Sequence, residues 1–147
     1  MKKIREIGIE AFIQATEDQE KAVFAIKNLF PPELREEIEL DIDKLRGVYH
    51  NQITVIRAKF AANAQQVLEY ISNKLNTSDK EYLFKSISRR VDEKGNIFLR
   101  IGKQELFQEK MEIKEIRDTI KMKISLTRKY SIQDIMTILQ ELDLIKA

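Results

Sequence analysis

Five segments of the chain alternate apolar and polar residues with the two-residue period of a half-buried β-strand. They are residues 7–13, 37–43, 52–60, 97–101 and 120–126. Because 37–43 and 52–60 are joined by a short connection, we expect them to form an antiparallel pair. The pattern therefore predicts a sheet with one apolar face.

The segment 37–43 alternates as clearly as any in the chain. Three aliphatic residues are expected to face a core: Ile38, Leu40 and Ile42. Four acidic residues should then form a row on the opposite face: Glu37, Glu39, Asp41 and Asp43. This acidic row is a solvated or cross-strand-paired strand face, which is the ordinary case, or else a magnesium site or carboxylate pair of a metal-dependent nuclease.

Helical stretches lie between the strands. A capping box at Thr16 predicts a helix through about Phe30, which Pro31-Pro32 should end. Apolar residues at helical spacing follow in 67–75. A second capping box at Ser78 predicts a helix through about Arg90, and Ser131 should cap the last helix.

The expected order is β-α-β-β-α-α-β-(β)-β-α, in which the bracketed strand is the least marked. No linker or repeat divides residues 1–147. We therefore predict a single α+β domain with a mainly antiparallel mixed sheet and helices packed on one face.

Composition excludes several kinds of chemistry. The 147 residues include one histidine and no cysteine, so no Cys–His dyad and no His-rich metal site can form. The glycine-rich motifs that bind phosphates and dinucleotides are absent from the sequence. We expect no catalysis, no cofactor and no metal, and a cytoplasmic protein, because no apolar run is long enough to span a membrane.

Positive charge is concentrated in two segments, although the net charge is only +2. Residues 85–103 hold six cations and two anions, and residues 119–130 hold four cations and no anion. A polyanion responds to such local clusters more than to the total charge.

Several residues of these two segments are candidates for contact with RNA. Phe98 and Arg100 should lie together on one strand face, where an aromatic ring can stack a base while a cation holds a phosphate. The other basic candidates are Arg89, Arg90, Lys103, Lys121 and Lys123. An alternative for Lys121 and Lys123 is cross-strand pairing with Glu39 and Asp41.

Four segments resemble a family of small archaeal RNA-binding proteins described as a predicted exosome subunit. The most specific is 90–104, with Arg-Val-Asp, then Gly, Leu-Arg and Lys-Gln. The strings 14–23, 47–53 and 118–124 are similar to further parts of that family. Gln52 after Asn51, and Gly102 before Lys-Gln, depart from its usual pattern.

The resemblance implies a compact α+β fold similar to the ribosomal protein that binds 5S RNA, and RNA binding without catalysis. Exosome or ribosome-related components are the implied partners. By position it marks Arg90, Arg100, Lys103 and Gln104, followed by the loop residues Tyr49 and His50. The alternative is a protein-interaction or homodimerisation module, in which Phe98 lies at a contact and the cations are held in ion pairs.

Overall fold

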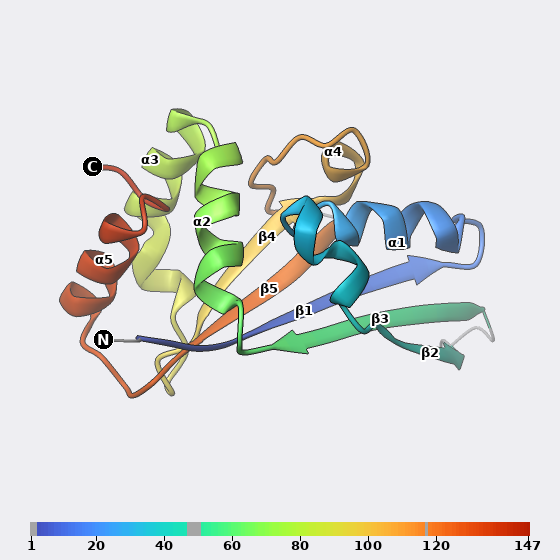
Figure 1. Ribbon diagram of the computed structural model, residues 1–147, viewed down its shortest axis with the longest axis horizontal. Helices are drawn as coiled ribbons and strands as arrows, with labels where there is room; N and C mark the ends of the chain where they lie inside the picture. The colour runs from blue at the N-terminus through green and yellow to red at the C-terminus, as the bar shows by residue number, and fades with distance from the viewer. Residues whose placement is uncertain (1–2, 47–50, 117) are drawn as a thin grey trace.

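The computed structural model describes residues 3–46, 51–116 and 118–147. This part of the chain contains five strands and five helices, in the order β1-α1-β2-β3-α2-α3-β4-α4-β5-α5 (Figure 1). The strands are β1 (Ile4–Gln14), β2 (Asp41–Arg46), β3 (Gln52–Phe60), β4 (Ile97–Gly102) and β5 (Thr119–Leu126). The helices are α1 (Gln19–Lys27), α2 (Ala64–Lys74), α3 (Thr77–Ser86), α4 (Lys103–Phe107) and α5 (Ile132–Glu141), with 3-10 turns at Pro32–Glu37 and Ile87–Arg90.

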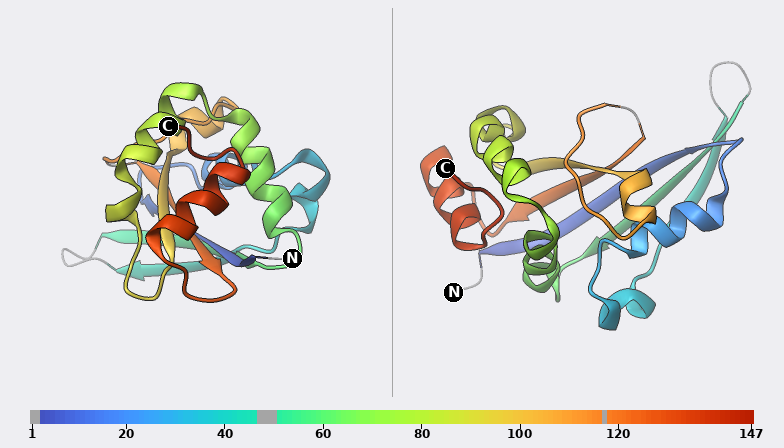
Figure 2. Two further views of the ribbon diagram at one scale, coloured as in Figure 1. Left: turned by 90° about the vertical axis from the view of Figure 1, so that its left-hand side faces the viewer. Right: turned by 90° about the horizontal axis from the view of Figure 1, so that it is seen from above.

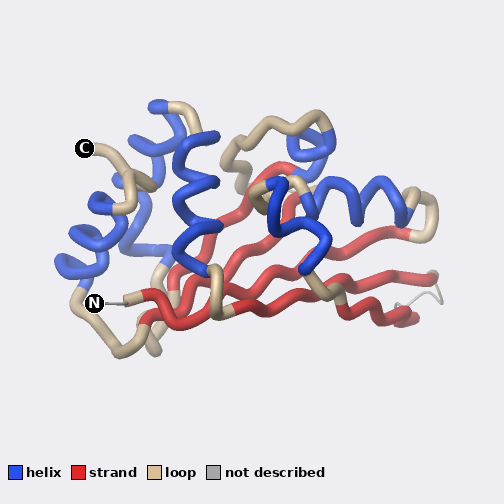
Figure 3. The backbone as a smooth tube through the Cα atoms, in the orientation of Figure 1, coloured by secondary structure: helices blue, strands red, loops and turns tan. Residues whose placement is uncertain are grey.

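The strands form one sheet in the order β2-β3-β1-β5-β4, and every neighbouring pair is antiparallel. The helices lie on one side of this sheet, which confirms the predicted α+β class (Figure 3). Helices α2, α3 and α5 cover one half of that side, and α1 and α4 cover the other (Figures 1 and 2). Within the described residues, no helix lies on the other side of the sheet (Figures 1 and 3).

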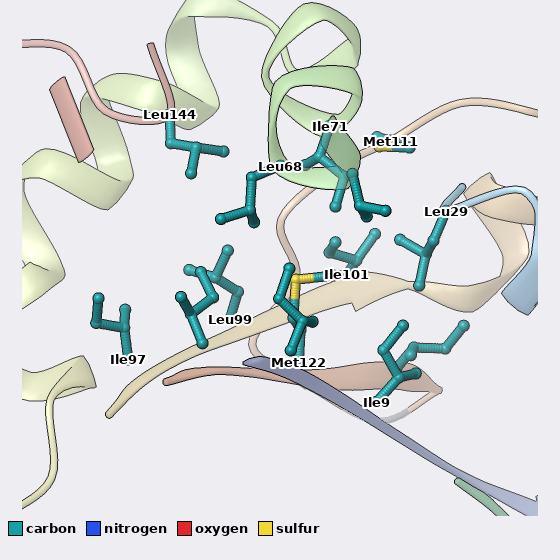
Figure 4. Close-up of a cluster of buried hydrophobic side chains, with 14 of the residues drawn as sticks. Ile9, Leu29, Leu68, Ile71, Ile97, Leu99, Ile101, Met111, Met122 and Leu144 are labelled. Atoms are coloured by element: carbon teal, nitrogen blue, oxygen red, sulfur yellow. The ribbon is translucent and has the colours of Figure 1, made fainter. Parts of the chain in front are cut away.

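The core lies between the sheet and the helices. Alternate residues of β1 point into it, and Ile7, Ile9, Ala11 and Ile13 are all buried, as predicted. The central strand is flanked by buried partners, because Ile9 lies opposite Ala58 of β3 and Met122 of β5. Figure 4 shows strand side chains meeting Leu68 and Ile71 of α2 and neighbouring helical residues. In the helical segments 67–75 and 131–142, the residues that face the core are mostly apolar.

The prediction for residues 37–43 was wrong in its position. The chain turns in a 3-10 helix through Glu37, and β2 begins only at Asp41. Ile38 and Leu40 still pack partly against the core, but Ile42 is 38% exposed because β2 is an edge strand. The acidic row is therefore broken, since Asp41 and Asp43 are the two members that lie in the strand.

Two helix starts also differ from the prediction. Asp18, not Thr16, caps α1 by accepting from the Glu20 amide, and α1 ends at Lys27 rather than Phe30. Asn76, not Ser78, caps α3 and accepts from the Asp79 amide at 2.7 Å. Short polar side chains stand at several neighbouring positions in both segments, so spacing alone does not select among them.

The predicted cap of the last helix is confirmed, whereas the strand written in brackets in the expected order is replaced by a helix. Ser131 caps α5 and accepts from the Asp134 amide at 3.1 Å, as predicted. Between β4 and β5 the chain forms the short helix α4 instead of a strand, with one isolated bridge between Ile101 and Ile113.

The cap of α3 gives a direct test of this structure. Asn76→Ala should lower the free energy of unfolding by about 1 kcal/mol, because a first-turn amide loses its acceptor. Ser78→Ala is the matched control, and it should change stability little because Ser78 is inside the helix. Urea unfolding of both variants compares the two positions, and a larger loss for Ser78→Ala would contradict the assignment.

Candidate nucleic-acid interface

The side of the sheet opposite the helices presents the even-numbered residues of β1, beginning with Glu6 and Gly8. This follows from alternation, since their odd-numbered neighbours Ile7 and Ile9 are buried in the core. We call this side the open face. Sequence-predicted residues from β4 and β5 also lie on it, because the buried residues of those strands alternate with them.

One row across the open face combines two lysines and an aromatic ring around a glycine. Gly8 lies opposite Lys59 of β3 on one side and opposite Lys123 of β5 on the other. Lys123 in turn lies opposite Phe98 of β4. Lys59 and Lys123 are exposed, and Phe98 is half-buried. The row carries no acidic side chain.

The next row brings together Arg100, Lys121, Glu10 and Arg57. Arg57 donates to Glu10 at 3.0 Å and to Asp43 of β2 at 3.4 Å, so its charge is balanced. The Lys121 ammonium lies 4.9 Å from the centroid of the Phe98 ring, a cation–π contact. Phe98 and Arg100 thus share a strand face, as predicted, and the pairing of β4 with β5 adds Lys121 and Lys123 to that face.

The alternative pairing of Lys121 and Lys123 with Glu39 and Asp41 was wrong. Asp41 belongs to β2, and strands β3 and β1 separate β2 from β5. Glu39 precedes β2 and lies outside any strand. The cross-strand neighbours of Lys121 are Glu10 and Arg100 instead.

Four cations of the open face are free of close ion pairs. Within residues 3–46, 51–116 and 118–147, no carboxylate lies within 4 Å of Lys59, Arg100, Lys121 or Lys123. Arg100 makes one long hydrogen bond of 3.5 Å to the Thr119 hydroxyl. No carboxylate of the described residues therefore takes up the charged donors of these four side chains.

The positive charge of Lys123 contributes to lowering the pKa of a nearby carboxyl group, that of Asp92. Asp92, in the turn before β4, accepts from the amides of Lys94 and Asn96 at 2.9 Å each. Slight burial works to raise the pKa of Asp92, but the hydrogen bonds from Asn96 and Lys94, with the nearby Lys123 charge, hold it below its usual value. The turn itself has Gly95 at φ 85°, as predicted for a glycine turn.

The open face is hollowed at Gly8. A depression of about 450 Å³ lies there, and its walls include Lys59, Phe98, Lys121 and Lys123 together with the ion-paired Glu10 and Arg57. The glycine supplies no side chain, so the row has a gap between its two lysines. We call this depression the Gly8 hollow.

Lys103 lies in a different setting from the open-face lysines. Its side chain is 5% exposed, and its ammonium lies 2.7 Å from Glu17 and 2.9 Å from Asp118. It also approaches the carbonyl oxygen of Phe12 at 3.4 Å. Lys103 therefore joins the end of β1, the start of α4 and the start of β5.

The two carboxylates hold the charge of Lys103 in place. Burial works to lower the pKa of Lys103, but hydrogen bonds to Glu17 and Asp118 outweigh it and raise that pKa. Burial likewise works to raise the pKa of Asp118, while hydrogen bonds from Lys103 and Gln104 hold it below its usual value. Gln104 is exposed and donates to Asp118 at 3.0 Å, so it supports the same cluster.

Arg90 is buried like Lys103 and is engaged on all sides. It donates to the Ser86 hydroxyl at 2.8 Å, forms an ion pair with Glu115, and lies 5.4 Å from the Tyr82 ring centroid. Arg89 is exposed and donates to the Tyr82 hydroxyl at 2.7 Å. Both arginines thus lie in the 3-10 turn that follows α3, and neither lines the Gly8 hollow.

Two sequence-predicted residues, Tyr49 and His50, lie outside the described residues. Residues 3–46, 51–116 and 118–147 contain no group of three or more His, Cys, Asp or Glu that could hold a metal ion. In the same ranges, no helix is both long and apolar enough to cross a membrane.

Sequence reasoning missed Lys59, Gly8 and Glu17. Lys59 follows Arg57 on the polar side of a predicted strand. Alternation therefore indicates that Lys59 faces outward, but it does not show that Lys59 lies near Lys123. Gly8 interrupts the polar side of the first strand, and this interruption was the available signal.

Comparison with known proteins adds a family and a fold. A family model described as RNA binding matches residues 6–126. The RNA-binding protein PAB1135 of Pyrococcus abyssi is 33% identical over 121 residues, which cover 80% of this chain and 79% of that protein.

Solved structures share the fold over nearly the whole length. Protein AF2318 of Archaeoglobus fulgidus has a TM-score of 0.79 at 23% identity, and the match covers 95% of this chain and 99% of that one. Protein SSO0741 of Sulfolobus solfataricus has a TM-score of 0.77 at 26% identity, covering 95% and 97%.

The buried lysine gives a stability prediction. Lys103→Met should lower the free energy of unfolding by about 1–3 kcal/mol, because Glu17 and Asp118 lose their shared donor. Lys110→Met is the control, since Lys110 is exposed and lies in no ion pair of the described residues. Urea unfolding at neutral pH measures both, and equal stabilities would contradict the structural role of Lys103.

The lowered pKa of Asp118 gives a pH prediction. A carboxyl group with a lowered folded-state pKa contributes stability above its unfolded value, near 3.8, and loses it as the pH falls through the lower folded-state pKa. The wild-type protein should therefore be more stable than Asp118→Asn at pH 7, and the gap should close in acid. Asparagine tolerates the positive φ of 69° at this position. Thermal unfolding of both proteins from pH 7 into strong acid measures the stability difference. A difference that persists in strong acid would contradict the prediction.

Proposed function

Because this chain belongs to the family of RNA-binding proteins whose model matches residues 6–126, we propose that it binds RNA on the open face of its sheet. The observation that carries the proposal is the set of four open-face cations, of which three lie beside Phe98 and Lys59 lies beside Gly8, and no carboxylate of the described residues pairs with them within 4 Å. The relative PAB1135 is named as an RNA-binding protein, and this supports the same ligand class.

The open face has the parts that RNA binding requires. Donors for phosphate oxygens come from Lys59 of β3, Lys121 and Lys123 of β5 and Arg100 of β4, and β1 with Gly8 lies between β3 and β5. Phe98 supplies an aromatic ring among these cations. Bases of single-stranded RNA stack on aromatic side chains of sheets, while cations follow the backbone.

Buried cations have a supporting part in this proposal. Lys103 and Arg90 are 4% and 6% exposed, and carboxylates already engage them. We assign them to holding the ends of β4, α4 and β5 in place, and we assign direct contact to the exposed cations. Gln104 and Arg89 are exposed beside these clusters, and we keep them as candidate contacts outside the open face.

The proposed activity is binding without a catalytic step, in line with a sequence that has one histidine and no cysteine. A role in RNA processing, with exosome or ribosome-related components as partners, belongs to the same proposal. It is supported by the sequence resemblance, as is the likeness to the 5S RNA-binding ribosomal protein.

An alternative ligand of the open face is a protein or a second copy of the chain. Phe12 and Leu45 are 53% and 49% exposed at the end of the face that lies away from Gly8. This alternative calls for cations held in ion pairs around Phe98. Within the described residues, the cations around Phe98 are not held in ion pairs. The observations therefore favour RNA as the ligand at the Phe98 end of the open face.

Removal of two open-face lysines should weaken RNA binding and its salt dependence together. Each lysine that neutralises a phosphate of single-stranded RNA contributes about 0.7 to the slope of log affinity against log salt. Lys59→Ala with Lys123→Ala should therefore reduce the slope by about 1.4 and the affinity by about 25-fold at 0.1 M salt. Titration of a labelled, unstructured RNA at several salt concentrations measures both quantities.

The control for this titration is a pair of exposed lysines on the helical side of the molecule. Lys85→Ala with Lys110→Ala makes the same change of net charge away from the open face. Urea unfolding should show that both double variants are as stable as the wild type. An unchanged affinity in Lys59→Ala with Lys123→Ala would overturn the proposed surface and leave the protein-contact alternative.

A further inference from the structure

Gly8 has no structural reason to be glycine. It lies in the interior of the central strand β1 and pairs in register with strands on both sides. Its φ lies outside the left-handed region, where Gly95 is found. A Cβ atom built on Gly8 would meet nothing within 4 Å.

Glycine weakens a strand interior, because it adds backbone freedom to the unfolded chain and offers no side chain to pack. The register irregularity of β1 lies between Ile4 and Glu6, so Gly8 itself is not part of a bulge. The remaining common reason for a strand glycine is the close approach of a ligand or of another backbone.

The Gly8 hollow has the size for a single nucleotide, and its lining is positive on balance, because it holds three lysines and Glu10 is paired with Arg57. Its volume of about 450 Å³ falls within the range of small-ligand sites. Lys59 and Lys123 flank Gly8 on the two adjacent strands, so their backbones are about 10 Å apart. The Phe98 ring lies next to Lys123 on the far side.

We propose that the Gly8 hollow holds one unpaired nucleotide of a single-stranded RNA, with its phosphate between Lys59 and Lys123 and its base on Phe98. This inference rests on the proposed function. The Lys121 ammonium now covers the Phe98 ring at 4.9 Å. A base that stacks on this ring displaces the ammonium, which then becomes a further donor to the RNA backbone.

The hollow selects for unpaired RNA, because a duplex keeps its bases stacked inside the helix and cannot lower one onto the ring. A duplex can still meet Lys59, Lys121, Lys123 and Arg100 through its phosphates. We therefore expect two binding modes on this face. Binding of unpaired RNA depends on Gly8 and Phe98, whereas binding of duplex RNA does not.

The experiment fills the hollow. Gly8→Leu should weaken binding of a short oligouridylate about tenfold or more, and Gly8→Ala should weaken it less, because the loss follows side-chain size. Binding of a blunt RNA duplex of equal length should be unchanged, and the melting temperature should not fall. Gln14→Leu is the matched control, because Gln14 is exposed on the same strand and face but does not line the hollow.

Phe98→Leu should likewise weaken binding of the oligouridylate and spare the duplex, because leucine keeps apolar bulk but cannot stack a base. Unchanged oligouridylate binding by Gly8→Leu would overturn the nucleotide site, as would an equal loss for both RNAs. These outcomes are separable from failure of the proposed function, which appears as unchanged affinity in Lys59→Ala with Lys123→Ala.

A second measurement covers the case in which Gly8→Leu does not fold. Uridine monophosphate is titrated into the wild-type protein, and backbone amide shifts are followed by NMR. Shifts centred on Gly8, Lys59, Phe98 and Lys123 are expected. Shifts confined to the helical side, or none at millimolar nucleotide, would overturn the inference.

Discussion

The two-residue period of the central strand sets the two sides of this molecule. Ile7, Ile9, Ala11 and Ile13 are buried under the helices, so the residues between them must face the other way. A slip of one residue in the pairing of β1 would place Glu10 in the core and Ile9 in solvent. Burial of the isoleucines therefore fixes the positions of Gly8 and of every cation that lies opposite it.

Burial also divides the basic residues into two groups. Arg90 and Lys103 lie within the fold and meet carboxylates from distant segments, because an unpaired buried charge would be costly. Lys59, Lys121, Lys123 and Arg100 project from strands whose outer side has no helix. The first group keeps the strand ends and α4 together, and the second group remains accessible on the sheet that they hold in place.

Strand positions and the side that each residue faces were predictable from the sequence, because alternation reports burial directly. Strand order was not, since nothing in the alternation of 52–60 shows that β3 lies beside β1, and this concealed the neighbourhood of Lys59 and Lys123. The edge strand was misplaced because Ile38 and Leu40 pack partly against the core without belonging to the sheet. The partners of the buried cations were also hidden, since Glu17 is 86 residues from Lys103 in the sequence.

Local charge explains how a chain with a net charge of only +2 can attract a polyanion. At physiological salt, charges separated by more than about 8 Å are largely screened, so acidic residues on the helical side do little to the open face. Arg100 and Lys121 lie directly opposite each other on adjacent strands, where like charges repel. The sheet holds them there because their strands are fixed by the buried residues on the other side. A phosphate bound there, as we propose, would relieve that repulsion, so the burial that folds the protein also sets the spacing of these charges.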